Sequence, residues 1–181
     1  ALLKVMEEPP EGVLFLLTAD SLAGVLPTIR SRCVSFAIAP VSPADCARYC
    51  TAHGVDKKTA ALYSELFDGH IGTVLTAARD KARTEQVDKA MELARAAQAG
   101  DSYTAAVLLA PYEKDKAGAA ALLRDLRAVA AAGLQGSPHA PVQGQQAQRT
   151  LRLAEAAIQR LGAQVNPKIV LTVFAARLAH A

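Results

Sequence analysis

The chain contains no tryptophan, and only 4% of its 181 residues are aromatic. A hydrophobic core must therefore be built from aliphatic side chains, and the hydrophobic fraction of 51% supplies enough of them. Alanine and leucine are abundant in this fraction, and both favour helix over sheet. The length is that of one or two small domains.

Long apolar runs, signal-peptide features and runs of charge of one sign are also missing. No apolar run approaches the roughly 20 residues that a membrane span needs. The first ten residues carry acidic side chains where a signal peptide has an apolar region. The formal net charge is only +3, without a polybasic arm or an acidic tail. We expect a soluble, cytoplasmic protein that does not associate with membranes.

The chain has three cysteines, and this odd number argues against a disulfide scaffold. Cys46, Cys50 and His53 share one face of a predicted helix, and three such ligands are able to bind zinc. However, thiols four residues apart are not the usual zinc-knuckle spacing, and no fourth ligand is evident. We therefore predict no metal site. Cys33 is expected to be a buried small hydrophobic residue.

The first 38 residues have the pattern of the end of an α/β domain. A helix is predicted for residues 1–8, ended by a Pro-Pro pair that lacks backbone donors. Residues 13–17 form an unbroken apolar run, which is typical of a strand covered on both faces in a parallel sheet. Short helical turns are predicted around Pro27. Residues 34–38 alternate enough to predict a second strand.

From residue 40 onwards the sequence predicts helices only, and residues 39–84 predict a small lid-like bundle. Ser42 begins the first helix as its cap, and Asp56 begins the second. A turn at 69–72 precedes a third helix that is predicted to reach about Arg83.

Residues 85–181 predict a second helical domain. Its helices are expected at 85–99, 113–134, 147–162 and from Pro167 onwards, with a further helix opened by Asp101. Residues 135–146 are rich in Gly, Pro and Gln and contain almost no core-forming residue. This segment is predicted to be a flexible loop.

Several spaced motifs in the first 36 residues carry a family resemblance. They are ALLK at 1–4, EEPP at 7–10, FLL at 15–17 and LPTIRSRC at 26–33. Together they resemble the AAA+ subunits of the bacterial DNA polymerase III clamp loader. Beyond residue 40 the similarity is one of layout. It implies the C-terminal remnant of a nucleotide-binding-type domain at 1–38, a lid at 39–84 and an oligomerisation collar at 85–181.

The resemblance also implies roles for individual residues. Thr18 takes the sensor 1 position, and it follows the predicted strand at 13–17, at the end where α/β sheets bind ligands. The motif Ser31-Arg32-Cys33 implies that Arg32 is an arginine finger for the nucleotide of a neighbouring subunit. Arginine suits this role because its planar fork is permanently charged. Outside this pattern, Arg32 would be interpreted as a surface residue or a helix C-cap.

One departure from the family indicates which kind of subunit the chain resembles most. ATP-hydrolysing subunits carry a sensor 2 arginine in the third lid helix, where this chain has Gly72. A glycine cannot hold a phosphate by charge. Delta-prime subunits are similar to this chain, since they keep the Ser-Arg-Cys motif and lose the sensor 2 arginine. The resemblance therefore implies the C-terminal part of a delta-prime-like stator that is not itself catalytic.

The implied partners are the gamma/tau and delta subunits and, through the assembly, the sliding clamp and primed DNA. No cofactor is expected on this chain, since the ATP belongs to the neighbouring subunit. Two alternatives stay open: a gamma/tau-type ATPase subunit, and a free-standing helical interaction domain with a chance similarity. Arg79, Lys81 and Arg83 are expected to end the third helix, where cations complement its dipole, with DNA contact as the alternative.

Overall fold

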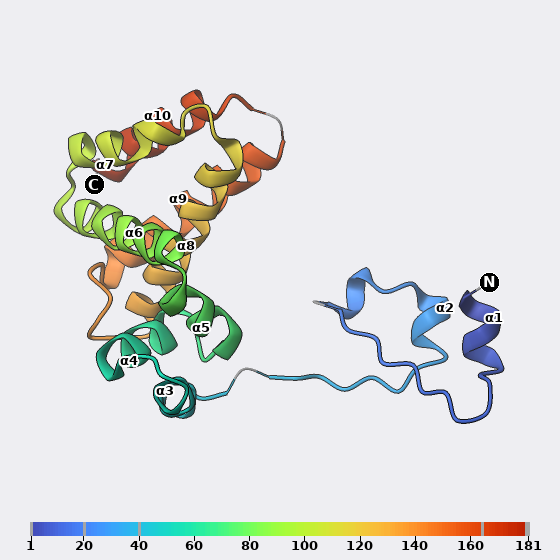
Figure 1. Cartoon of the computed structure of the whole chain (residues 1–181). Helices are drawn as coiled ribbons and strands as arrows, with labels where there is room; N and C mark the ends of the chain where they lie inside the picture. The colour runs from blue at the N-terminus through green and yellow to red at the C-terminus, as the bar shows by residue number, and fades with distance from the viewer. Residues whose placement is uncertain (1, 20, 40, 164, 180–181) are drawn as a thin grey trace. The chain divides into compact units, whose positions relative to one another are not determined.

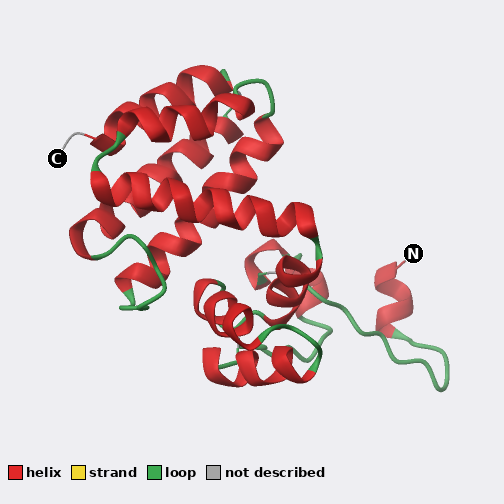
Figure 2. Cartoon of the chain, turned by 60° about the vertical axis from the view of Figure 1, so that its left-hand side comes forward, coloured by secondary structure: helices red, strands yellow, loops and turns green. Residues whose placement is uncertain are grey.

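The structure is a computed structural model that describes residues 2–19, 21–39, 41–163 and 165–179. It divides into two compact units, Ala1–Ala39 and Pro40–Ala181. All regular elements in the described ranges are helices, so the chain is mainly α, as predicted (Figure 2). No helix in these ranges has the length and apolarity to cross a bilayer.

In its described residues, the first unit contains three short helical elements. They are α1 (Leu2–Glu7), the 3-10 turn η1 (Leu22–Gly24) and α2 (Pro27–Arg30). The Pro-Pro pair follows α1 closely, which agrees with the predicted stop. Pro27 is the first residue of α2, where its fixed φ and missing N–H fit a helix start.

The two predicted strands are wrong. Residues 13–19 and 34–39 have no regular secondary structure, and the described residues include no strand. A strand is stable only when backbone groups pair with a neighbour, and a single segment has no ladder to join. In the 13–19 segment, the backbone–backbone hydrogen bond runs from the Val13 N–H to the Pro10 oxygen over 3.1 Å.

The apolar side chains of these two segments are not covered by the first unit. Leu14 is 88% exposed and Ile38 is 93% exposed, with Leu16, Val34 and Phe36 also largely exposed. The prediction that both faces of the 13–17 run are covered is therefore wrong within this unit. Contiguous apolar surface of this kind marks a site for further contacts.

The second unit consists of eight α-helices and one 3-10 turn in the described ranges. They are α3 (Pro43–Ala52), α4 (Lys57–Leu66), α5 (Ile71–Arg79), α6 (Lys81–Ala99), α7 (Ser102–Leu109), η2 (Ala110–Tyr112), α8 (Lys116–Leu134), α9 (Gly144–Gly162) and α10 (Pro167–Ala179). Helix α8 packs against α9 and α6, and α10 packs against α7 and α9 (Figure 1). Helices α3, α4 and α5 form a group at one end that joins the rest through the contacts of α5 with α6 and of α4 with α8.

Side-chain caps place the helix starts where the sequence predicts them. Ser42 Oγ accepts a hydrogen bond from the Asp45 N–H over 3.1 Å, and Asp56 accepts from the Thr59 N–H over 3.0 Å. Asp101 caps α7 in the same way. These contacts satisfy backbone donors that a helix start leaves free, which confirms the predicted starts.

The core of the second unit is aliphatic, as the lack of aromatic residues requires. The stripe on α8 is fully buried, namely Leu122, Leu123, Leu126 and Val129. Small residues complete the contacts between helices, and Gly133 is the clearest case. A Cβ at Gly133 would lie 1.9 Å from the Val142 carbonyl oxygen, so the chain approaches α8 too closely for a side chain.

The helix predicted to reach about Arg83 is shorter than predicted, and the next helix begins earlier. Helix α5 ends at Arg79, because the Asp80 carboxylate accepts from the Ala82 N–H over 2.9 Å and caps α6. Lys81 and Arg83 therefore lie in the first turns of α6, and the prediction that they end the third helix is wrong. The predicted boundary between residues 84 and 85 lies inside α6, and the division into lid and collar stays a prediction.

The segment predicted as a flexible loop contributes to the core. Ala140 and Val142 are buried, so the expectation of almost no core-forming residue is wrong. The Gln143 side chain donates to the carbonyl oxygens of Ser137 (2.8 Å) and Ala140 (2.9 Å). A hydrogen bond from Ser137 Oγ to Glu65 ties the same segment to α4.

Candidate functional site

Arg32 lies in the turn that follows α2, and four hydrogen bonds hold its guanidinium. Nη1 donates to the Thr28 carbonyl oxygen over 2.7 Å and to Ser31 Oγ over 3.3 Å. Nε donates to Glu7 Oε1 over 2.6 Å, and Nη2 donates to the same oxygen. The fork is thus held between the end of α1 and the end of α2.

The sequence explains how these groups meet. Helix α1 ends at Glu7, directly before Glu8 and the Pro-Pro pair. Helix α2 has only one turn, and the Arg32 side chain donates to the Thr28 carbonyl oxygen within it. This bond is the C-capping contact that arginine often makes at a helix end. Glu7 supplies the negative charge.

The Arg32 side chain keeps access to solvent and spare bonding capacity. It is 33% exposed, and the Glu7 side chain is 46% exposed. A guanidinium carries five N–H donors, and four are used in the bonds above. Among the described residues, the remaining Nη2 hydrogen has no partner. An exposed ion pair of this kind contributes only about 0–1 kcal/mol, so it opens readily.

The other predicted residues of the first unit lie as follows. Ser31 Oγ donates to the Thr28 carbonyl oxygen over 3.2 Å, so Ser31 belongs to the turn that carries Arg32. Cys33 is half-buried, which corrects the prediction of a buried residue, because the short unit does not cover it fully. Thr18 is exposed on the extended segment, and its sensor 1 role stays a prediction.

Gly72 is the second residue of α5 in the second unit, and it is exposed. A Cβ placed on it would meet no atom within 4 Å, and its φ is not in the left-handed region. Packing and backbone conformation therefore do not require glycine here. The Cβ of any other residue, including an arginine, would meet no atom within 4 Å at this position.

The cysteines considered as metal ligands lie in the core. Cys46 and Cys50 are buried on α3, whereas His53 is exposed and stacks on Tyr49 with ring centroids 4.0 Å apart. Burial raises the pKa of the Cys50 thiol, and the adjacent Cys46 raises it further. The described ranges contain no group of three metal-binding side chains. These thiols therefore serve as small core residues.

An ion pair between a half-buried arginine and a buried aspartate in the second unit was not predicted from the sequence. Arg83 on α6 donates through Nη2 to Asp125 Oδ1 on α8 over 2.5 Å, and through Nη1 to Oδ2. Gln86 Nε2 adds a bond of 2.7 Å to Oδ2. The hydrogen bond to Asp125 raises the pKa of Arg83. An Asp in the middle of the apolar α8 stripe was the only signal in the sequence.

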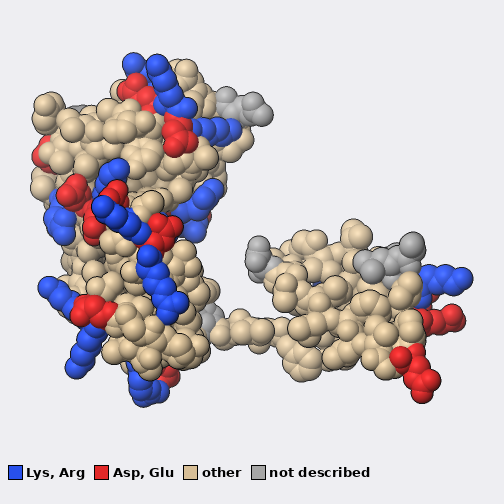
Figure 3. Space-filling view, in the orientation of Figure 1, with Lys and Arg blue, Asp and Glu red and all other residues tan. Residues whose placement is uncertain are grey.

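The basic residues weighed as a DNA contact have partners within the unit. Arg79 Nη2 donates to the His53 carbonyl oxygen over 2.7 Å, and Arg83 is paired with Asp125. Lys81 Nζ lies 4.0 Å from the Glu85 carboxylate. Side chains of both signs are interspersed on the face of this unit in Figure 3. This arrangement does not favour a dedicated DNA surface there.

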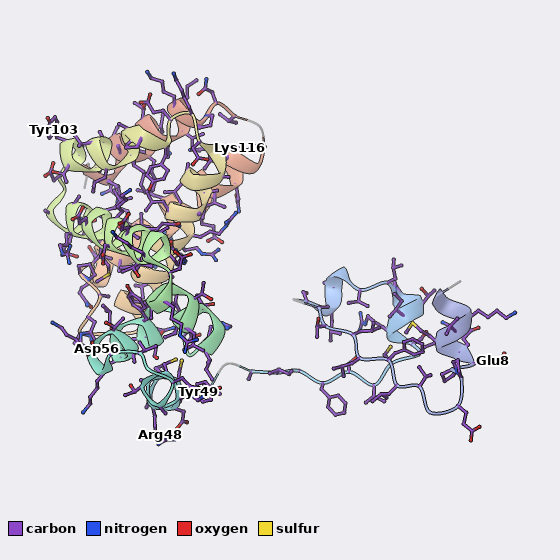
Figure 4. All side chains as sticks on the ribbon, viewed as in Figure 1. Glu8, Arg48, Tyr49, Asp56, Tyr103 and Lys116 are labelled. Carbon is purple, nitrogen blue, oxygen red and sulfur yellow. The ribbon has the colours of Figure 1, made fainter. Side chains whose placement is uncertain are left out.

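Helices α7 and α10 border an apolar groove of about 350 Å³. Tyr103, Leu109, Leu171 and Ala175 are among its lining residues. Tyr103 is 79% exposed and points away from α7 (Figure 4). The groove contains few polar groups, so it suits an apolar contact rather than a charged ligand.

The comparisons with known proteins bear on the first unit. No curated protein and no solved structure matches the chain. Residues 1–42 match the family described as DNA polymerase III, delta subunit. The match spans ALLK, EEPP, FLL and LPTIRSRC, the motifs that also surround the Arg32 turn. Over this segment, the chain is similar to that family.

Proposed function

We propose that the chain is part of a delta-prime-like stator of the DNA polymerase III clamp loader. In this role it hydrolyses no ATP and binds no cofactor of its own. Arg32 completes the ATP site of a neighbouring subunit, and the assembly places the sliding clamp on primed DNA. The partners are the gamma/tau and delta subunits, in the cytoplasm.

The observation that carries the proposal is the Arg32 turn. The LPTIRSRC motif lies within the matched segment, and Arg32 follows a single helical turn at the surface. Its guanidinium is one-third exposed and keeps one N–H without a partner in the described ranges. A phosphate with two negative charges competes strongly for such a group, because arginine binds phosphate oxygens through its planar fork.

Gly72 favours the stator over a gamma/tau-type ATPase. Nothing within 4 Å of its Cβ position prevents a side chain. The lack of a sensor 2 arginine is therefore not forced by packing. A subunit that hydrolyses its own ATP would use a cation there, and a stator has no such need.

The exposed apolar groups support contacts with sister subunits. Tyr103 and Val107 on α7, and Ile169 on α10, are all more than half exposed. Such residues on neighbouring helices fit a collar that packs against similar helices. Likewise, the exposed apolar side chains at 13–17 and 34–38 fit further contacts with a partner.

The test is Arg32→Ala in a clamp loader reconstituted with this chain in its natural length. Arginine fingers contribute about 10³–10⁵ in rate, so hydrolysis at the site that Arg32 completes should nearly stop. DNA-dependent ATP hydrolysis and clamp loading should then both fall. Arg30→Ala is the matched control, since Arg30 is an exposed arginine of the same turn. Unchanged hydrolysis and loading by the Arg32→Ala loader would refute the proposal.

A further inference from the structure

We infer that Glu7 is a positioning residue for Arg32. It lies 25 positions before Arg32 in the chain, and its Oε1 accepts from both Nε and Nη2. This inference rests on the proposed in trans role of Arg32. Glu7 is the first glutamate of the EEPP motif. In this role it acts through Arg32 and not on the nucleotide itself.

The geometry is that of a guanidinium held on two sides. Glu7 binds the Nε side of the fork, and the Thr28 carbonyl oxygen binds Nη1 over 2.7 Å. The two acceptors come from different helices, so the plane of the fork is fixed relative to both. The Nη2 hydrogen that lacks a partner then has a defined direction. Glu7 and Thr28 set that direction before any phosphate arrives.

Such a hold matters because an arginine side chain has many rotamers. Ordering a free arginine costs conformational entropy at the moment it binds a phosphate. A side chain that is already ordered avoids that cost, and this raises the rate of a step that depends on its position. The ion pair with Glu7 does not prevent Arg32 from binding a phosphate, because both side chains are partly exposed and the pair opens easily.

Glu8 provides a matched control. It is adjacent to Glu7, carries the same charge and is exposed at the end of α1 (Figure 4). No hydrogen bond or ion pair joins Glu8 to a side chain in the described ranges. A general effect of negative charge near α1 would be lost equally in Glu7→Gln and Glu8→Gln. A positioning effect would be lost only in Glu7→Gln.

The experiment measures DNA-dependent ATP hydrolysis by the reconstituted loader with Glu7→Gln, Glu8→Gln, Arg32→Ala and the double variant Glu7→Gln/Arg32→Ala. The glutamine keeps an acceptor oxygen and loses the charge. We expect Glu7→Gln to lower kcat about two- to fivefold, the range of an exposed charge pair, with KM for ATP unchanged. Glu8→Gln should match the wild type. The double variant should be no slower than Arg32→Ala alone.

The outcomes separate this inference from the proposed function. If Arg32→Ala slows hydrolysis and Glu7→Gln does not, only the role of Glu7 is refuted. A faster Glu7→Gln loader would also refute it, because Glu7 would then withhold Arg32 instead of orienting it. If the double variant is slower than Arg32→Ala, Glu7 acts by another route and the inference fails. If Arg32→Ala has no effect, the proposed function fails and the role of Glu7 with it.

A second measurement needs no partner subunits. In the ¹⁵N-labelled chain, the Nε–Hε resonance of Arg32 reports directly on the bond to Glu7. We expect this resonance to shift and exchange faster with water in Glu7→Gln, and to stay unchanged in Glu8→Gln. An Arg32 resonance that is the same in all three proteins would mean that the pair does not form, and would overturn the inference.

Discussion

The Arg83–Asp125 pair gives the sharpest test of how the second unit is held together. Arg83 on α6 and Asp125 on α8 are 42 residues apart and form a two-bond pair, which Gln86 extends. The Asp125 side chain is only 7% exposed, whereas that of Arg83 is 23% exposed. The two halves of the pair are therefore not equivalent, and their removal should have different costs.

Replacing Arg83 with Met keeps most of the apolar stem and leaves a buried carboxylate without its cation. Breaking a buried pair in this way costs about 3–5 kcal/mol. Gln86 still donates one hydrogen bond to Asp125, so we expect Arg83→Met to lower the free energy of unfolding by about 2–3 kcal/mol. Asp125→Asn should cost less, about 1–2 kcal/mol, because the Arg83 head group can turn toward water.

The double variant Arg83→Met/Asp125→Leu should recover most of the loss, since two apolar side chains of similar volume often replace a buried pair without penalty. Urea unfolding followed by the helical circular-dichroism signal measures all three variants. Urea is preferred because guanidinium would screen the charges. If Arg83→Met costs under about 1 kcal/mol, or if Asp125→Asn is the more damaging change, the pair is not buried as described.

Two further predictions concern local features. Gly72→Ala should raise the free energy of unfolding by up to about 1 kcal/mol, because alanine favours the helix and meets no atom there. Gly133→Ala should lower it, because the new Cβ would clash with the Val142 carbonyl oxygen. Urea midpoints measure both variants, and equal effects would contradict the packing described for the two glycines. The hydrogen bond from the Thr59 N–H lowers the pKa of Asp56, so the stability from this cap is full above the unfolded carboxyl pKa near ~4 and is lost as the pH falls through the lower folded value. Asp56→Asn should weaken the pH dependence of the urea midpoint in that acid range. A pH profile identical to that of the wild type would refute the contribution of the cap.

The parts of the fold that the sequence predicts best are those that depend on neighbours along the chain. Ser42, Asp56 and Asp101 cap helices by binding N–H groups three residues away. Such contacts form whatever the rest of the molecule does. Helix starts were therefore predictable to within a few residues. The early start of α6 at Lys81 is the exception, since the cap at Asp80 was not predicted.

The parts that could not be predicted depend on groups far away in the sequence. The apolar run at 13–17 has the composition of a buried strand, but a strand forms only beside another strand. The 135–146 segment has the composition of a loop, yet Val142 reaches the core because Gly133 lets the chain come close. The 13–17 run lacks a neighbouring strand among the described residues, so it stays extended without pairing. The loop segment finds a packing partner in α8, so it becomes part of the core.

The candidate site divides in the same way. The motif around Arg32 was recognisable from the sequence, since its residues are consecutive. Its partner Glu7 was not, although it lies in a neighbouring motif of the same pattern, because nothing in the spacing of 25 residues indicates a contact. The structure adds a physical reason for two motifs of one segment to occur together.

The bonds of Arg32 within its own unit bear directly on the proposed in trans role. A guanidinium buried with all its donors satisfied would be unable to serve a neighbour, since its release would cost several kcal/mol. Arg32 is one-third exposed, and its carboxylate partner is nearly half exposed. The pair is therefore worth about 0–1 kcal/mol, and a phosphate with two negative charges competes for the same guanidinium. The phosphate of a neighbouring subunit can thus bind Arg32 beside Glu7 or in its place. Ordering the Arg32 side chain costs more free energy than breaking its bond to Glu7.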